Sequence, residues 1–477
     1  MPTQTTTHTY ISNNISHTHR PWQIEAIIQE DYNTLDPEMT KILNWMVEQK
    51  AFNQFAHGRD PFIVHLRGTW EILRNWNQPI PVARCGLFHS AYTRSGFYFR
   101  YFDITGKLNS IPLNLKKVSF SNTLLVHTLL TDKNSRKKLS DVIGTEAEHL
   151  VYQYCWTEKL WDARETFGPS KDWSKYAGMM DPTMANAPID PNAVKLGEPL
   201  NPNGYDAESR VRPGTYIHYT PEEIANYFVV FVADLVDQLT DVTSYISVYH
   251  PDGHANNTPD RMWPGTGKPG MLRNITGMSF FSRMLYGCKD YLANVPPVFN
   301  NCTEVLDLQD ELKARDLYWN ARTQEHEKTM EELENMYRES CELNPYCAEP
   351  HIMVSQLAYA RGAYDDAAHY AIVAIDLLYQ WGTNWDKQVS FTQWVGFARM
   401  CLIKAKRRQE GLPALPSRPV AHDAKHGIGG QPQEATFLQD LLSEFHKYEV
   451  GNGSNGITMS ATSMDVGGKT TKRESKL

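Results

Sequence analysis

HLRGTWEILRNWNQPIPVARCGLFHSAY, residues 65–92, is the stretch that decides the fold. Apolar side chains recur at helical spacing on both sides of an Asn-Gln-Pro turn, and Pro81 suits the first position of a second helix. His65 lies early in the first predicted helix and His89 late in the second. If the helices pack antiparallel, both imidazoles reach one cavity, and a neutral imidazole nitrogen is the commonest protein ligand for a transition metal. The predicted apolar face consists of Leu66, Thr69, Trp70, Leu73, Val82, Ala83, Leu87 and Phe88.

The composition is that of a globular protein with more than one domain. The chain has 477 residues, of which 41% are hydrophobic, and no run of about 18 apolar residues, so we expect no membrane span. The net charge of -8 without a long basic stripe argues against nucleic acid as a partner. A small anionic, phosphorylated substrate stays compatible with this charge, because a local pocket can be basic on an acidic protein.

The cysteines and the N-terminus bear on localisation. The seven cysteines are an odd number without a CxxC framework, which favours reduced thiols in a cytoplasmic protein. Residues 1–20 are polar and lack the basic and apolar regions of a secretory signal, so we predict a disordered tail. The sequence leaves organelle targeting open.

Helical patterns flank residues 65–92. Residues 21–56 are predicted helical, with Asp36 as a cap and Met39, Ile42, Leu43, Met46 and Val47 on one face. Residues 134–160 predict two helices broken at Gly144. Residues 220–242 form a strong helical pattern that begins with the cap Thr220 and buries Asp234 in an apolar interior.

Two insertions interrupt these helices. Aromatic and polar residues alternate around a Thr-Gly-Lys turn, which predicts a β-hairpin between Phe97–Asp103 and Lys107–Leu113. It would either cover the helical cavity as a flap or shield an apolar edge. Residues 162–222 are rich in Pro, Gly, Asn and Asp and predict a long surface loop.

The C-terminal half predicts a second helical domain. Residues 344–382 resemble a tetratricopeptide unit, with small residues that allow two helices to approach closely. One clear repeat is too few for a free-standing solenoid, so we expect it to pack on the N-terminal unit. The predicted organisation is a tail over 1–20, a helical domain over 21–250, a linker over 251–273, a helical module over 274–408 and a mostly disordered tail over 409–477.

Residues 65–92, together with the later helix that carries Asp234, resemble the HD superfamily of helical metal-dependent phosphohydrolases. The resemblance covers roughly residues 40–245 and is nearest to guanosine tetraphosphate hydrolase domains and to an uncharacterised HD-like family with the phrase "GLFHS-Y". The family pattern is an early His, a His-Asp pair and a late Asp. His65, His89 and Asp234 match the His and late Asp positions, which implies a site for Fe, Mn or Zn.

The chain departs from the family at the pair itself, where Ser90 stands in place of Asp. A serine hydroxyl is a weaker ligand than a carboxylate, so two alternatives arise. Either the site recruits a replacement carboxylate, with Glu146, Glu148 and Asp237 as candidates, or it is metal-free and forms a ligand-binding or purely structural pocket. Without a metal, the two glutamates are simply acids in the first turn of a helix, where the helix dipole favours them. Asp237 is then a solvent-exposed helix residue.

The sequence therefore predicts an all-α protein with a small β-hairpin insert and three alternative functions. In the first, a metal-dependent hydrolase, Ser90 and Asp237 orient water, and Arg67, Tyr92 and Arg94 meet the substrate. In the second, a catalytically silent scaffold binds a protein partner through its C-terminal helices. The third is a di-iron oxygenase, a chemistry that some relatives of the same fold perform.

Overall fold

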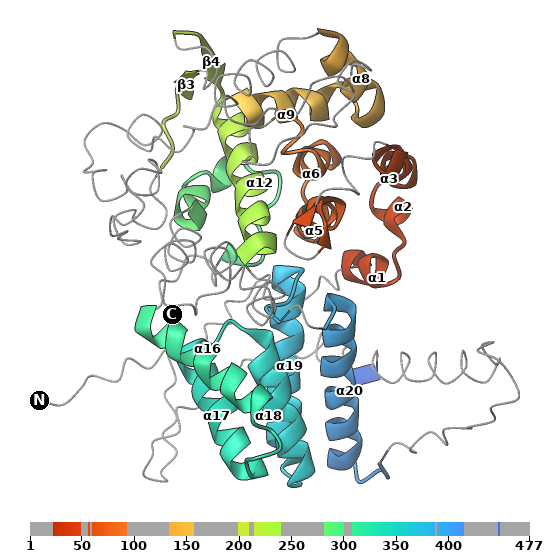
Figure 1. Ribbon diagram of the computed structural model, residues 1–477, viewed down its shortest axis with the longest axis vertical. Coiled ribbons are helices and arrows are strands. Elements are labelled where there is room, and N and C mark those ends of the chain that lie inside the picture. The colour runs from red at the N-terminus through yellow and green to blue at the C-terminus, as the bar shows by residue number, and fades with distance from the viewer. Residues whose placement is uncertain are drawn as a thin grey trace, which may run out of the picture. The chain divides into compact units, whose positions relative to one another are not determined.

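The computed structural model describes residues 22–48, 56–57, 60–92, 133–156, 199–208, 214–239, 281–299, 308–386, 389–414 and 447–448. Over these residues the fold is all-α, with two small pairs of antiparallel strands (Figure 1). The prediction of an all-α fold with a small β insert is confirmed. The predicted hairpin between Phe97 and Leu113, Arg94 and the linker over 251–273 lie outside the described residues.

The chain divides into two units. The first comprises Pro21–Leu312 and Leu378–Phe391, and the second Lys313–Leu377 with the chain from Thr392 onward. The sequence placed the start of the C-terminal module at residue 274, whereas the first unit extends to Leu312. Phe281 is buried in the core of the first unit and packs edge-on against Phe231, with ring centroids 4.6 Å apart. The apolar side of this later segment therefore belongs to the core around Phe231.

Three short helices begin the first unit: α1 (Trp22–Ile28), α2 (Tyr32–Leu35) and α3 (Met39–Glu48). The first break has a backbone cause, because Glu30 has a positive φ of 54°. Met39, Ile42 and Met46 are buried as predicted, whereas Val47 is 52% exposed and does not belong to the buried face.

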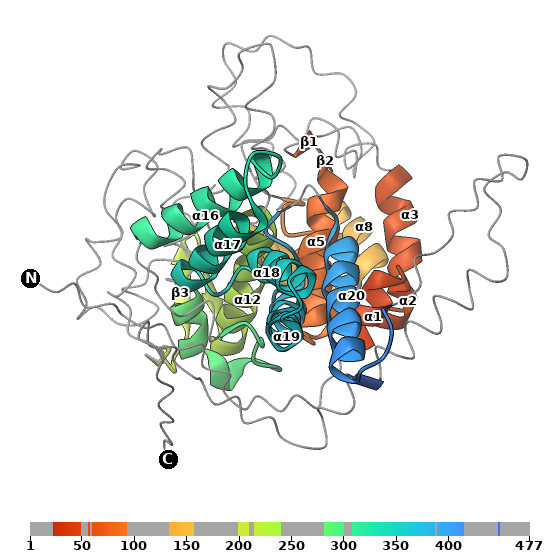
Figure 2. The same ribbon diagram turned by 90° about the horizontal axis from the view of Figure 1, so that it is seen from below.

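Residues 65–92 lie largely in an antiparallel helix pair, α5 (Phe62–Asn75) and α6 (Ile80–Leu87). The short strands β1 (Ala56–His57) and β2 (Asp60–Pro61) pair just before α5 (Figure 2). A Cβ atom on Gly86 would lie 2.3 Å from Leu73 Cδ1, so glycine allows the close approach of the two helices. The apolar residues predicted to face inward are buried, but His89 follows the end of α6 in a turn.

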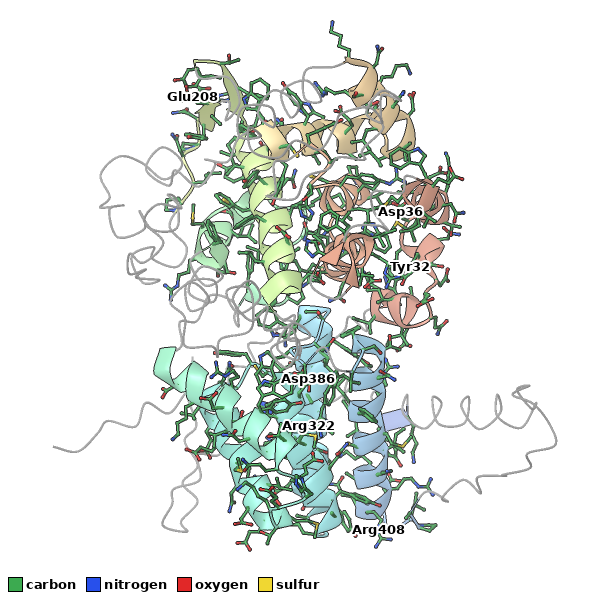
Figure 3. All side chains as sticks on the ribbon, viewed as in Figure 1. Tyr32, Asp36, Glu208, Arg322, Asp386 and Arg408 are labelled. Atoms are coloured by element: carbon green, nitrogen blue, oxygen red, sulfur yellow. The ribbon has the colours of Figure 1, made fainter. Side chains whose placement is uncertain are left out.

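A buried ion pair fixes α6 against the N-terminal helices. The Asp36 carboxylate, which Figure 3 labels, accepts hydrogen bonds from Arg84 Nε at 2.7 Å and Nη2 at 2.6 Å. Arg84 Nη1 also donates to the Ile143 carbonyl at 2.9 Å. Because Asp36 is fully buried, this pair determines where α6, and the turn that carries His89, is placed.

Further along the described part of the first unit lie the helices α8 (Lys133–Ile143), α9 (Thr145–Trp156) and α12 (Pro221–Leu239). The predicted break between α8 and α9 is confirmed at Gly144, whose φ is 91°. Thr220 caps α12 as predicted, because its backbone N–H donates to Glu223 at 2.8 Å while its hydroxyl accepts from the Glu223 N–H at 3.3 Å.

The predicted loop over 162–222 contains structure that the sequence prediction missed. Strands β3 (Tyr205–Glu208) and β4 (Tyr216–Tyr219) pair antiparallel, with Tyr205 opposite Tyr219. Both of these tyrosines are buried, and the Tyr219 hydroxyl donates to the Gln153 carbonyl of α9 at 2.6 Å. Side-chain burial against α9 therefore overrides the turn-forming composition of the segment.

The second unit is helical. Its described elements are α16 (Leu308–Thr323), α17 (Met330–Leu343), α18 (Ala348–Ala360), α19 (Tyr364–Trp381) and α20 (Phe391–Gln409), of which α16, α19 and α20 run past the unit's boundaries. Ala367, Ala371 and Ala374 are fully buried on α19, which is the close packing that their size predicts. None of the helices in the described ranges has both the length and the apolar character needed to cross a lipid bilayer.

Candidate metal centre

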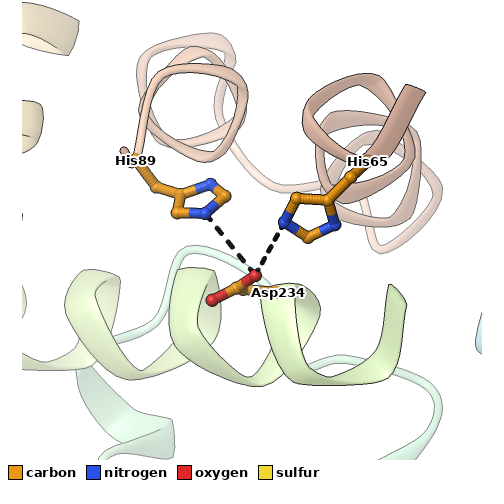
Figure 4. Close-up of side chains that lie close together, drawn as sticks. All are labelled: His65, His89 and Asp234. Atoms are coloured by element: carbon orange, nitrogen blue, oxygen red, sulfur yellow. Dashed lines mark ion pairs between the residues drawn. The ribbon is translucent and has the colours of Figure 1, made fainter. Parts of the chain in front are cut away.

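Three side chains from distant parts of the sequence meet in the first unit (Figure 4). His65 comes from the first turn of α5, His89 from the turn after α6, and Asp234 from the middle of α12. One possible ligand atom from each lies within 4.8 Å of the others. Both histidines direct Nε2 toward Asp234 Oδ1, at 3.1 Å from His65 and 3.5 Å from His89. This is the convergence that the sequence predicted.

The outer nitrogens of both rings are held by the protein. His89 Nδ1 lies 2.7 Å from the Gly86 carbonyl, to which it donates as an N–H. His65 Nδ1 donates in the same way to Asp237 Oδ2 at 2.6 Å. With each Nδ1 engaged as a donor, the lone pair of a neutral ring is on Nε2, the atom that faces Asp234. Protein-bound metal sites orient their histidines in this manner.

The three residues are almost completely buried, with 6% exposure for His65, 4% for His89 and 7% for Asp234. Burial lowers the pKa of His89 below its usual value, which keeps that ring neutral. Burial also acts to lower the pKa of His65, but hydrogen bonds to Asp234 and Asp237 outweigh it and raise the pKa to about 10. In the metal-free protein a proton on His65 therefore offsets the negative charge of the carboxylates.

Aromatic rings line one side of the cluster. The imidazoles of His65 and His89 meet edge to face, with centroids 5.4 Å apart, and Tyr154 packs edge-on to His89 at 6.0 Å. Tyr227 stacks on Tyr154 at 4.6 Å. The helical pattern over residues 134–160 did not indicate that Tyr154 packs against a histidine. The available signal was Tyr227, which lies seven residues before Asp234 and so on the same face of α12.

The same two tyrosines line a narrow cavity. Its lining consists of Cys85, Leu150, Gln153, Tyr154, Tyr219, Glu223, Asn226, Tyr227 and Val230. It has room for about one water molecule. Gln153 Nε2 donates to Glu223 at 2.6 Å, while Gln153 Oε1 is buried and has no hydrogen-bond partner among the residues that the structure describes. A water molecule in the cavity could donate a hydrogen bond to this oxygen. The cavity is too small for an organic substrate.

The predicted replacement carboxylates are placed differently from one another. Glu146 is exposed on α9, as a first-turn acid is expected to be. Glu148 is buried and binds Arg136 through both carboxylate oxygens, at 2.7 and 2.8 Å. The Tyr92 hydroxyl donates to Glu148 at 3.0 Å. Glu148 is therefore bound by both Arg136 and Tyr92, and none of these hydrogen bonds involves His65, His89 or Asp234.

Of the remaining predicted residues, Ser90 is buried directly after His89 in the same turn. Arg67 lies on α5 beside Glu71, with Nε 3.1 Å from the carboxylate, and its guanidinium stands over the Tyr32 ring at 5.7 Å. Neither contact involves His65 or His89, so the predicted substrate role of Arg67 stays a prediction.

Comparison with known proteins adds one local similarity. A family described as a domain of unknown function, DUF6817, matches residues 46–111. The matched span includes His65 and His89 and ends before Asp234, and it covers a small part of the chain. No curated protein and no solved structure matches this chain.

Proposed function

We propose that the chain is a metal-dependent hydrolase whose metal is held by His65, His89 and Asp234. The observation that carries the proposal is the direction of both imidazole Nε2 atoms toward one carboxylate oxygen, with both Nδ1 atoms engaged elsewhere. Two imidazole nitrogens and one carboxylate oxygen suit Fe, Mn or Zn and leave coordination positions open.

When bound, a divalent metal of this kind supplies Lewis acidity that makes water a nucleophile near neutral pH. The residues of the chain supply the rest. The apolar and aromatic surroundings, Tyr154 and Tyr227 among them, limit access of bulk water. The resemblance to HD phosphohydrolases indicates a small phosphorylated or nucleotide-like substrate, and this substrate class belongs to the proposal.

The test is hydrolysis of chromogenic phosphate esters by the full-length protein loaded separately with Mn, Fe and Zn. Both a p-nitrophenyl monoester and a bis-p-nitrophenyl diester serve as probes. We expect turnover that depends on the added metal and that falls to the background rate in His89→Ala. Metal-loaded protein with no turnover of either ester would contradict the proposed phosphohydrolase activity.

A second candidate is a catalytically silent scaffold that binds a protein partner through the C-terminal helices. Two observations favour it: Ser90 stands where the family has a metal-binding Asp, and Glu148 is already bound by Arg136. This candidate predicts protein that folds without metal and hydrolyses neither ester.

A third candidate is a di-iron oxygenase, because the resemblance includes such enzymes and because histidine and carboxylate side chains are ligands of iron. It predicts oxygen consumption by the Fe-loaded protein that the Zn-loaded protein lacks. The same two metal-loaded preparations therefore distinguish it from hydrolysis.

A further inference from the structure

The imidazole of His65 lies between two carboxylates of a single helix. Asp234 and Asp237 are three residues apart on α12 and contact opposite nitrogens of the ring. Asp237 makes the shorter contact, with Oδ2 2.6 Å from Nδ1, against 3.1 Å from Asp234 Oδ1 to Nε2. The Asp237 side chain is only 15% exposed, so this hydrogen bond is largely shielded from water.

A glycine on α5 makes the Asp237 contact possible. Gly68 follows His65 by three residues and therefore lies on the same side of that helix. A Cβ atom at Gly68 would lie 2.2 Å from Asp237 Oδ1 and 2.9 Å from its Cγ. Real atoms do not approach so closely, and Asp237 has a short side chain already committed to His65. Any larger residue at position 68 would thus displace the carboxylate.

We infer that Asp237 is a positioning residue that holds His65 for metal binding, and that Gly68 forms the notch that admits it. The inference rests on the proposed metal-binding function and replaces the water-orienting role that the sequence suggested for Asp237. Its carboxylate lies on the Nδ1 side of the ring, whereas the proposed ligand atom is Nε2. Partners of this kind fix the ring and raise its basicity, and their loss costs 10- to 100-fold in metal affinity.

Cobalt binding to the full-length protein tests this role. The dissociation constant comes from competition with a chromophoric chelator, and the visible Co²⁺ spectrum reports the ligand geometry. We expect Asp237→Leu to weaken binding about 10- to 100-fold and to change the spectrum. Asp237→Asn keeps an oxygen that accepts from Nδ1 and should recover most of the lost affinity. Equal weakening by both substitutions would overturn the positioning role.

The glycine supplies an independent arm of the experiment. Gly68→Ala should weaken Co²⁺ binding as much as Asp237→Leu, and the double variant should be no weaker than either single variant, because both changes remove one contact. Gly396→Ala is the matched control, since it also lies in a helix but has open space around the added Cβ. Unchanged Co²⁺ binding in Gly68→Ala would overturn the role of the notch.

A measurement on metal-free protein separates this inference from the proposed function. In protein labelled with ¹⁵N-histidine, the hydrogen-bonded Nδ1 proton of His65 should give a slowly exchanging, downfield resonance. Its loss in His65→Phe assigns it to that residue, and the ¹⁵N couplings within the ring distinguish Nδ1 from Nε2. Asp237→Asn should keep the resonance, whereas Asp237→Leu and Gly68→Ala should lose it. If the wild type binds no metal but shows this pattern, the metal function fails and the positioning contact stands. If Asp237→Leu keeps the resonance, the inference fails whatever the metal result.

Discussion

Replacing Arg84 by methionine would remove one half of the ion pair that connects α6 to the N-terminal helices. The Asp36 carboxylate would stay fully buried and lose two hydrogen bonds of 2.6 and 2.7 Å. The Ile143 carbonyl would lose its 2.9 Å donor in the same step. The hydrogen bond from the Glu38 backbone N–H, at 3.1 Å, would remain but carries no full charge.

The expected cost follows from the burial of the pair. Removing one partner of a buried ion pair costs about 3 to 5 kcal/mol, because the remaining charge is left uncompensated. That is a large part of the roughly 5 to 15 kcal/mol by which a domain is stable. The double variant Arg84→Met with Asp36→Leu should be more stable than Arg84→Met alone, since it leaves no buried charge.

Urea unfolding followed by circular dichroism measures these differences in the full-length protein. Lys137→Met is the matched control, because the Lys137–Asp141 pair has side-chain exposures of 72% and 62% and should contribute no measurable stability. Unfolding of Arg84→Met at the same urea concentration as the wild type would contradict the stabilising role of this ion pair. A double variant that is the least stable protein of the set would contradict it as well.

Two further predictions concern packing and pH. Gly86→Ala places a Cβ 2.3 Å from Leu73 Cδ1 and should destabilise the first unit by about 1 to 3 kcal/mol. Gly396→Ala has open space around the added Cβ and should stabilise the protein slightly. Thermal unfolding measures both variants, and equal unfolding midpoints would contradict the close approach of α5 and α6. Burial, with a smaller effect of His369, lowers the pKa of His351 to about 3, against about 6.5 in the unfolded chain. Below pH 6.5 the unfolded chain binds a proton that the folded chain does not, so the free energy of unfolding should fall by about 2 kcal/mol from pH 7 to pH 5. His351→Gln should lack this part of the pH dependence, and an identical slope in both proteins would contradict the assigned burial.

The elements that carry the ligands could be predicted from the sequence because their signals are local. The spacing of apolar residues on both sides of the Asn-Gln-Pro turn predicts the α5–α6 pair. Thr220 and Glu223 form a local capping pattern that predicts the start of α12. With those helices in place, His65, His89 and Asp234 are polar residues next to largely apolar faces, and the structure brings the three together.

The roles that depend on distant partners could not be predicted in this way. Glu148 lies in the first turn of α9, where an acid is favoured by the helix dipole, and only the packing shows that Arg136 binds it. Asp237 lies one turn after Asp234, so sequence spacing alone does not tell a metal ligand from a partner of His65. The decisive feature was the absence of a side chain at Gly68, whose effect depends on the neighbouring helix.

The metal content of freshly purified full-length protein shows whether His65, His89 and Asp234 hold a metal ion. We expect near-stoichiometric Fe, Mn or Zn in the wild type and its loss in His89→Ala. His351→Ala is the control, because it removes an equally buried histidine of the second unit and should retain the metal. Folded wild-type protein that contains no metal and takes up none on addition would contradict the claim, as would metal retained in His89→Ala with unchanged affinity.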